Sequence, residues 1–179
     1  NEAVAEGIGK ALADMLDPGT VAVGRDMRPD SGALADAVIA GLTSQGRDVI
    51  DIGQVTSDMI YFAVGSMGLA GGAMVTASHN PGKDNGIKLC REQAKPIGHE
   101  SGLFAIRDAV IAGTFNPAAE KTGTVTVKNI DEGWVQHVLS FVDADKLKPM
   151  RIAVDAGNSM AGKIFPELEP YVPWEVDEM

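Results

Sequence analysis

Short apolar runs alternate with segments of helical periodicity along most of the chain, and this alternation limits the fold more than any other feature. The apolar runs that predict strands lie at 20–24, 48–53, 71–75 and 86–90, and another begins at 151. The segments that predict helices lie at 4–16, 31–42, 56–63, 103–111 and 134–142. Strands that alternate with helices imply right-handed crossovers and a largely parallel sheet. The predicted fold class is α/β, with a mixed, mostly parallel sheet sandwiched by helices.

Cap residues and short runs refine this prediction. Ser31 is the predicted N-cap of the second helix, and Thr56 or Ser57 that of the third. The strand at 86–90 is expected to lie at an edge of the sheet or to run antiparallel to its neighbour. Residues 114–129 are expected to be loop or short extended structure.

Lys148-Pro149 marks a predicted domain boundary. Residues 1–148 form one predicted domain, and a new strand-like run opens a second, similar domain over residues 149–179. The chain begins inside a helical pattern and stops soon after the second unit begins. We therefore expect the chain to be a partial fragment of a longer protein.

Charge and cysteine content narrow the functional class. The chain is 45% apolar and 22% charged, as is usual for globular proteins, and its net charge is −10 with a pI of about 4.6. An acidic surface of this kind argues against nucleic-acid and membrane-surface partners. Cys90 is the single cysteine, so no internal disulfide is expected. We expect neither a transmembrane segment nor a signal peptide, and therefore a cytoplasmic location. Nothing in the sequence indicates the oligomeric state.

Three polar loops follow predicted strands. They are Gly-Arg-Asp-Met-Arg at 24–28, Val-Thr-Ser-Asp at 55–58 and Thr-Ala-Ser-His-Asn-Pro at 76–81. The carboxyl ends of parallel strands lie at the same end of the sheet, where ligands of such folds bind. The three loops, although separate in sequence, are therefore expected to form one site.

The third loop carries a candidate nucleophile, Ser78, beside His79. A serine hydroxyl needs a base or positive surroundings to react. Adjacent side chains rarely aim at one another, and no Gly-x-Ser-x-Gly elbow is present, so a simple Ser-His hydrolase pair is disfavoured. Thr76 and Asn80 add small hydrogen-bonding groups suited to holding a ligand.

The charge around this loop suits a phosphate group. The cationic side chains of the loops and the following strand are Arg25, Arg28, His79, Lys83 and Lys88. Arginine forks match phosphate oxygens, and turn glycines expose backbone N–H donors. Lys88 can point back at Ser78, and a lysine that is desolvated near other cations can act as a base.

Structural explanations account for the same residues taken singly. Asn80-Pro81-Gly82 is a common turn signal, and a purely structural turn explains it equally well. Arg25 and Asp26 can pair internally at a strand end, and a lone lysine such as Lys83 is usually only a solvated charge. No cluster of His, Cys, Asp and Glu has metal-ligand spacing.

The combination of motifs is more specific than its parts. The stretch 76–81 followed by Asn-Gly-Ile-Lys at 85–88 resembles the active-site serine loop of the alpha-D-phosphohexomutases. This superfamily contains phosphoglucomutase, phosphomannomutase and phosphoglucosamine mutase. The segments 24–28, 56–63 and 155–158 resemble further family motifs in the family's order. The resemblance covers essentially the whole chain and looks most like bacterial phosphomannomutase/phosphoglucomutase.

The resemblance implies a four-domain enzyme, of which this chain is the N-terminal domain and the start of the second. Ser78 would be a phosphoserine that passes its phosphoryl group to a hexose phosphate, giving a bound hexose 1,6-bisphosphate. Lys88 would be the general base or acid, and His79 would support the transfer. Mg²⁺ would bridge the phosphate on Ser78 and aspartates outside this chain. The residues expected to bind substrate or phosphate are Arg25, Arg28, Thr76, Asn80, Lys83 and Asn85.

One position departs from the family pattern, because Asp84 stands where tyrosine is frequent. Other loops of the family's site are missing from this chain, so we expect the fragment alone to lack mutase activity. Two other functions stay open: a phosphoglucosamine mutase and a non-catalytic phosphate-binding module. The presence of both Ser78 and Lys88 argues against the module, since a pure binder needs no nucleophile.

Overall fold

The computed structural model describes residues 1–179, which form two compact units, Asn1–Lys128 and Asn129–Met179. Residues 129–148 belong to the second unit because helix α5 (Asp131–Leu139) packs on helix α6 (Ala161–Leu168). This packing division lies before the predicted domain boundary at 148/149, which stays a prediction.

The first unit is built on a six-stranded sheet of order β5-β4-β3-β1-β2-β6. Its strands are β1 (Val21–Arg25), β2 (Val49–Gln54), β3 (Gly71–Val75), β4 (Ile87–Arg91), β5 (Lys95–Pro96) and β6 (Val125–Val127). β3, β1, β2 and β6 are parallel, whereas β4 runs antiparallel to β3 and to β5. The mixed, mostly parallel sheet is thereby confirmed, and so is the antiparallel 86–90 strand. β6 lies in the segment predicted as loop or short extended structure.

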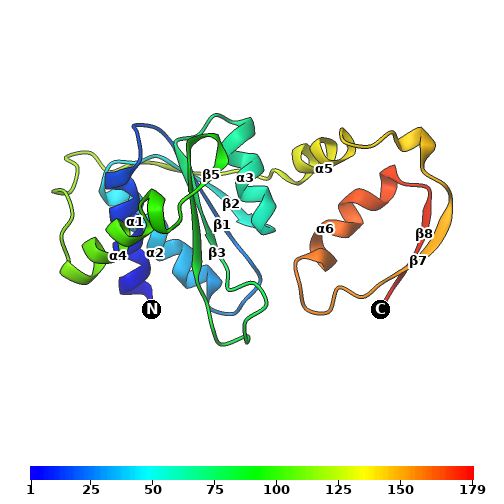
Figure 1. The fold of residues 1–179 in the computed structure, drawn as a ribbon, viewed down its shortest axis with the longest axis horizontal. Coiled ribbons are helices and arrows are strands. Elements are labelled where there is room, and N and C mark those ends of the chain that lie inside the picture. The colour runs from blue at the N-terminus through cyan, green and yellow to red at the C-terminus, as the bar shows by residue number, and fades with distance from the viewer. The chain divides into compact units, whose positions relative to one another are not determined.

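Helices cover both faces of this sheet (Figure 1). Helices α1 (Glu2–Met15), α2 (Ser31–Ser44) and α4 (Leu103–Ala112) lie on one side, and α3 (Ser57–Ser66) lies on the other. Alternate residues of β1 serve the two faces, as a period of two requires: Val21 and Val23 belong to the core beneath α1 and α2. On the α3 face, a side chain at Gly72 would collide with Val64 and Ile60, so the small residue permits close packing.

The predicted caps are partly corrected. Ser31 is the first residue of α2 and not its N-cap, which is Asp30. The Ser31 hydroxyl is fully buried and donates to Asp26 Oδ1 at 2.6 Å, so it is engaged in a tertiary contact. Thr56 is the N-cap residue of α3, as predicted.

The second unit pairs β7 (Met150–Val154) with β8 (Trp174–Glu178) in parallel, with α6 between them in the chain. This is the strand predicted from 151, continued by a helix and a second strand. Four short 3₁₀ helices lie at Glu92–Ala94, His99–Ser101, Ala144–Lys146 and Glu169–Tyr171.

No helix is both long and apolar enough to cross a membrane. Cys90 is buried in β4, and burial raises the pKa of its thiol to about 11. A thiol of this kind is almost wholly protonated at neutral pH, so Cys90 contributes packing and not chemistry.

Candidate active site

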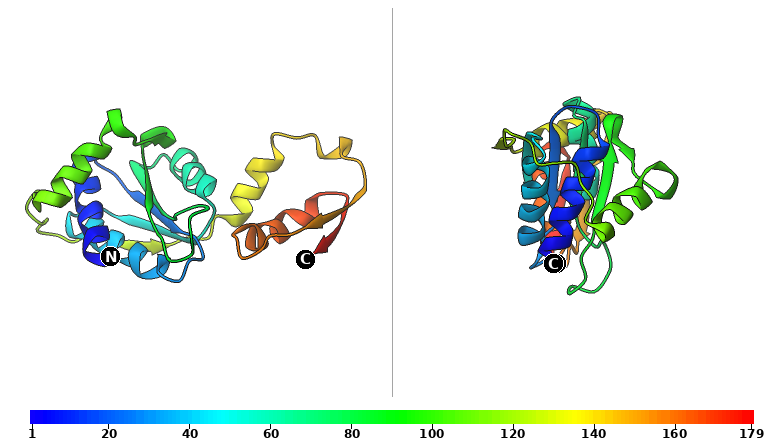
Figure 2. Two further views of the ribbon diagram at one scale, coloured as in Figure 1. Left: turned by 60° about the horizontal axis from the view of Figure 1, so that its bottom comes forward. Right: turned by 90° about the vertical axis from the view of Figure 1, so that its left-hand side faces the viewer.

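The three polar loops meet at the carboxyl ends of β1, β2 and β3, as predicted. The Asp26 N–H donates to the Val75 carbonyl at 3.0 Å, and the Val55 N–H donates to the Arg25 carbonyl at 2.9 Å. Figures 1 and 2 show the β3–β4 connection beside the β1–α2 connection at this end of the sheet. We call residues 76–86 the serine loop.

Ser78 is exposed and has a left-handed backbone, with φ of 55°. A non-glycine residue rarely adopts this conformation, and such strain concentrates at functional sites. The Ser78 N–H donates to Thr76 Oγ1 at 3.0 Å, so the side chain of Thr76, the first residue of the loop, holds the backbone of Ser78. Ser78 Oγ lies 3.3 Å from His79 Nδ1. The expectation that adjacent side chains would not meet is therefore wrong here, because the left-handed turn brings the two together.

The Arg28 side chain makes contacts that the sequence did not predict. Nη1 donates to the carbonyls of Pro81 (2.7 Å) and Asp84 (2.9 Å). Nη2 donates to the carbonyls of Ser78 (2.7 Å) and Asn80 (2.8 Å). Nε donates to Asp26 Oδ2 at 3.2 Å. All five N–H groups of the guanidinium are thus engaged with protein acceptors, so Arg28 holds the serine loop. Its expected role in binding phosphate stays a prediction.

Asp26 anchors this arrangement from below the loop and is only 8% exposed. Oδ1 accepts from the Arg28 N–H at 3.0 Å and from Ser31 Oγ at 2.6 Å. Burial alone would raise the pKa of Asp26. Hydrogen bonds from Ser31, Thr76 and the Arg28 backbone, with the positive charge of Arg28, outweigh burial and hold the pKa below its ordinary value.

This lowered pKa predicts how stability depends on pH. A group whose pKa is lower when folded stabilises the fold above its unfolded pKa of about 3.9, and this stabilisation is lost as pH falls through the folded value. We expect Asp26→Asn to lose about 2 kcal/mol at neutral pH, with the loss shrinking below about pH 4. Urea denaturation at about pH 7 and about pH 3 measures both values.

Asp36→Asn is the matched control, because Asp36 is an exposed carboxylate on α2. Its free energy of unfolding should stay close to that of the wild type at both pH values. An equal loss for Asp26→Asn at both pH values would contradict the assignment.

Two predicted binding residues, Thr76 and Asn85, make hydrogen bonds that hold the serine loop. Thr76 is buried, accepts from the Ser78 N–H and hydrogen-bonds Asp26. Asn85 donates from Nδ2 to Ser31 Oγ at 2.9 Å, and its Oδ1 accepts from the Gly86 N–H at 2.9 Å. These contacts engage both side chains within the protein, and the expected role of Thr76 and Asn85 in binding substrate stays a prediction.

The remaining predicted cations lie in different surroundings. Lys88 is exposed, and its Nζ donates to Ser57 Oγ at 3.3 Å. Lys88 is therefore not desolvated in this structure, and its expected role as general base or acid stays a prediction. Lys83 is exposed and lines a cavity of about 510 Å³ together with Glu2 and Asp30, whose negative charges disfavour an anion there. Arg25 has a buried Nη1 without a hydrogen-bond partner.

Asn80 is exposed at the loop, next to the serine and histidine. Its backbone N–H donates to the Ala77 carbonyl and its carbonyl accepts from Arg28. Its role in binding substrate stays a prediction. Ser57 belongs to the polar loop 55–58 that was expected at the site, but it was given no role there beyond a possible helix cap. Its contact with Lys88 supplies that role.

No group of three or more His, Cys, Asp and Glu side chains is placed to hold a metal ion.

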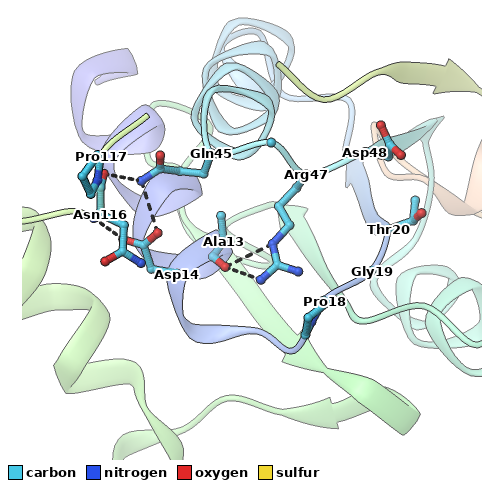
Figure 3. A pocket seen from close by; sticks show the side chains of 11 residues that line it. Ala13, Asp14, Pro18, Gly19, Thr20, Gln45, Arg47, Asp48, Asn116 and Pro117 are labelled. Atoms are coloured by element: carbon cyan, nitrogen blue, oxygen red, sulfur yellow. Dashed lines mark hydrogen bonds between the residues drawn. The ribbon is translucent and has the colours of Figure 1, made fainter. Parts of the chain in front are cut away.

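A second hollow, of about 470 Å³, lies at the amino ends of the parallel strands, where Thr20 and Asp48 precede β1 and β2 (Figure 3). Arg47 Nη2 and Nε there donate to the Ala13 carbonyl at 2.6 and 3.2 Å, and Nη1 donates to the Asp17 carbonyl. Arg47 thus satisfies carbonyls at the end of α1, which a helix leaves without partners. We therefore take the serine loop, and not this hollow, as the candidate functional site.

Comparison with known proteins shows which family the chain resembles. A phosphohexose mutase of Xanthomonas campestris is 48% identical over 175 residues, which are 98% of this chain and 39% of that protein. A phosphomannomutase of Salmonella typhimurium is 39% identical over 94% of this chain and 37% of its own length.

A solved phosphoglucomutase/phosphomannomutase family protein from Burkholderia thailandensis superposes with a TM-score of 0.86 at 26% identity. That match covers all of this chain and 40% of the other. The family model for phosphoglucomutase/phosphomannomutase, alpha/beta/alpha domain I, matches residues 1–117, which is more than half of the chain. The chain therefore belongs to the phosphoglucomutase/phosphomannomutase family and carries its N-terminal domain.

Proposed function

We propose that the protein is a phosphohexomutase that interconverts hexose 1-phosphate and hexose 6-phosphate, with mannose or glucose as the sugar. The observation that carries this proposal is Ser78: an exposed hydroxyl on a left-handed turn, 3.3 Å from His79 Nδ1, in a loop held by Arg28. The names of its relatives support the same reaction class.

In the proposed cycle, a phosphoryl group on Ser78 moves to the free hydroxyl of a bound hexose phosphate. The bond between Ser78 Oγ and phosphorus breaks, a bond from the sugar oxygen to phosphorus forms, and hexose 1,6-bisphosphate results. The bisphosphate turns over in the site and returns its other phosphoryl group to Ser78 Oγ. Such transfers depend mainly on positioning and charge neutralisation.

Lys88 and His79 handle protons and charge in this proposal. Lys88 takes the proton of the attacking sugar hydroxyl, or returns it in the reverse direction. Ser57 holds Lys88 Nζ near the carboxyl end of the sheet through their 3.3 Å contact. His79 Nδ1, beside Ser78 Oγ, supports the departure and return of the serine oxygen.

Mg²⁺ fits the proposal only in part from this chain's residues. When bound, the ion neutralises charge on the phosphoryl oxygens that move. A phosphate on Ser78 would supply one oxygen ligand, and the further oxygen ligands would be aspartates outside this chain. We also propose a cytoplasmic location, hexose 1,6-bisphosphate as activator, no nucleic-acid or membrane partner, and no mutase activity for this chain alone.

Assaying the full-length protein on mannose, glucose and glucosamine 1-phosphates tests the proposal directly. Turnover on mannose or glucose 1-phosphate is the expected result. Preference for glucosamine 1-phosphate would make it a phosphoglucosamine mutase, and binding without turnover of any of the three would contradict a mutase.

Lys88→Met should lower kcat by about 100-fold or more, because proton transfer by a positioned group contributes at least this much. Lys95→Met is the control, since Lys95 lies on the adjacent strand β5 and its Nζ is paired with Glu92. A steady-state mutase assay of both variants checks the prediction. Equal activity in the two would remove Lys88 from the mechanism.

A further inference from the structure

We infer that Arg28 is a positioning residue that sets the reactive pose of Ser78 without touching the substrate. This inference rests on the proposed function. It starts from an unusual use of an arginine: one guanidinium donates to four main-chain carbonyls of a single loop, at 2.7 to 2.9 Å.

The four carbonyls lie on both sides of the turn. Those of Ser78 and Asn80 accept from Nη2, and those of Pro81 and Asp84 accept from Nη1. The guanidinium is planar and rigid, so satisfying both pairs at once fixes the distance between the two arms of the loop. One of these acceptors is the carbonyl of Ser78 itself, the residue with the left-handed backbone. Arg28 therefore acts directly on the peptide that aims the nucleophile.

Buried partners hold Arg28 in turn. Its Nε donates to Asp26 Oδ2, and the two side chains are 11% and 10% exposed. Asp26 Oδ1 accepts from Ser31 Oγ, and Ser31 Oγ accepts from Asn85 Nδ2 at the far end of the loop. The start of the loop is tied to the same carboxylate through Thr76. Both ends and the middle of the serine loop thus depend on one buried carboxylate and one arginine.

A lysine cannot reproduce this arrangement. An ammonium has three donors on one atom, whereas Arg28 donates five bonds from three atoms spread across a plane. The inference therefore predicts that even Arg28→Lys, which preserves charge, loses the reactive pose. A residue needed only for positive charge near a phosphate would tolerate that change.

The experiment uses the full-length protein with Arg28→Lys, Arg28→Ala and a control, Arg107→Ala. Arg107 is an exposed arginine on α4 that pairs with Asp108. Both Arg28 variants should show kcat lowered by about 100-fold, since displacing a reacting group by about 1 Å has this effect. KM for the hexose phosphate should stay within about 3-fold, because Arg28 does not contact it. The control should match the wild type.

Two further measurements separate positioning from general folding. Millimolar guanidinium should restore part of the kcat of Arg28→Ala, by about 10-fold, because the free ion can occupy the four-carbonyl site. A variant that had merely unfolded would gain nothing from it. Hydrogen exchange should also be faster in peptides covering 76–86 of Arg28→Ala, while peptides covering β1 stay unchanged.

Wild-type kcat in Arg28→Lys, or a raised KM with unchanged kcat, would overturn the inference. The hydrogen-exchange comparison needs no turnover, so it tests the inference separately from the mutase proposal. If the wild type itself shows no turnover while exchange in the loop still depends on Arg28, only the proposed function has failed. Unchanged exchange in Arg28→Ala would overturn the positioning role in either case.

Discussion

Ser78→Ala should abolish mutase turnover in the full-length protein, lowering kcat on the order of 10⁴-fold or more. The side-chain oxygen is the atom that carries the phosphoryl group in the proposed cycle, and no other hydroxyl takes its place on the left-handed turn. Affinity for the hexose phosphate should change far less, since Ser78 contributes little to binding. Steady-state kinetics and calorimetric binding of the hexose phosphate give the two values.

Ser66→Ala is the matched control for this variant. Ser66 is an exposed serine at the end of α3, outside the three loops. It should retain wild-type kcat. Retention of turnover in Ser78→Ala would contradict the phosphoserine mechanism. If the wild type shows no turnover and Ser78→Ala binds the hexose phosphate with unchanged affinity, a phosphate-binding module is favoured.

Gly41→Ala should destabilise the first unit by about 3 kcal/mol or more. A Cβ at Gly41 would lie 2.1 Å from the Glu6 carbonyl oxygen, and one at Gly9 would lie 2.3 Å from the Val38 carbonyl oxygen. The backbones of α1 and α2 touch through these two glycines, so a methyl group forces the helices apart. The loss in core packing exceeds the gain in helix propensity, which is about 1 kcal/mol.

Gly65→Ala separates packing from propensity. Gly65 is also helical, but nothing lies within 4 Å of a Cβ built there. This control should be neutral or more stable than the wild type. Both tryptophans, Trp134 and Trp174, lie in the second unit, so hydrogen exchange of β1 peptides in urea is the suitable measurement. Equal stability of Gly41→Ala and Gly65→Ala would show that α1 and α2 do not depend on this contact.

The fold was largely predictable because its elements have distinct periodicities. The apolar run at 71–75 is β3 over those same residues, and the helix predicted at 103–111 is α4. The antiparallel β4 follows from a connection too short for a crossover. β6 lies within the segment predicted as loop or short extended structure, and its alternating Thr-Val-Thr-Val pattern at 124–127 is too short and too exposed to mark a strand clearly.

The residues of the candidate site were named more accurately than their roles. The sequence predicts that the three loops lie together, because the carboxyl ends of parallel strands lie at the same end of a sheet. It does not show which acceptors a side chain finds, and the acceptors of Arg28 are main-chain carbonyls, which every residue has. Sequence therefore predicted a phosphate-binding arginine where the structure has one that holds a loop. The contact between Ser78 and His79 also depended on one backbone angle that no local motif indicates.

The central claim is that Ser78 carries the phosphoryl group. Incubating the full-length protein with a hexose 1,6-bisphosphate and Mg²⁺, followed by phosphopeptide mapping by mass spectrometry, tests it most directly. The account predicts phosphate on Ser78, within the peptide that spans the serine loop, and none on the neighbouring Thr76. An unmodified Ser78 in the folded, full-length protein would contradict the account.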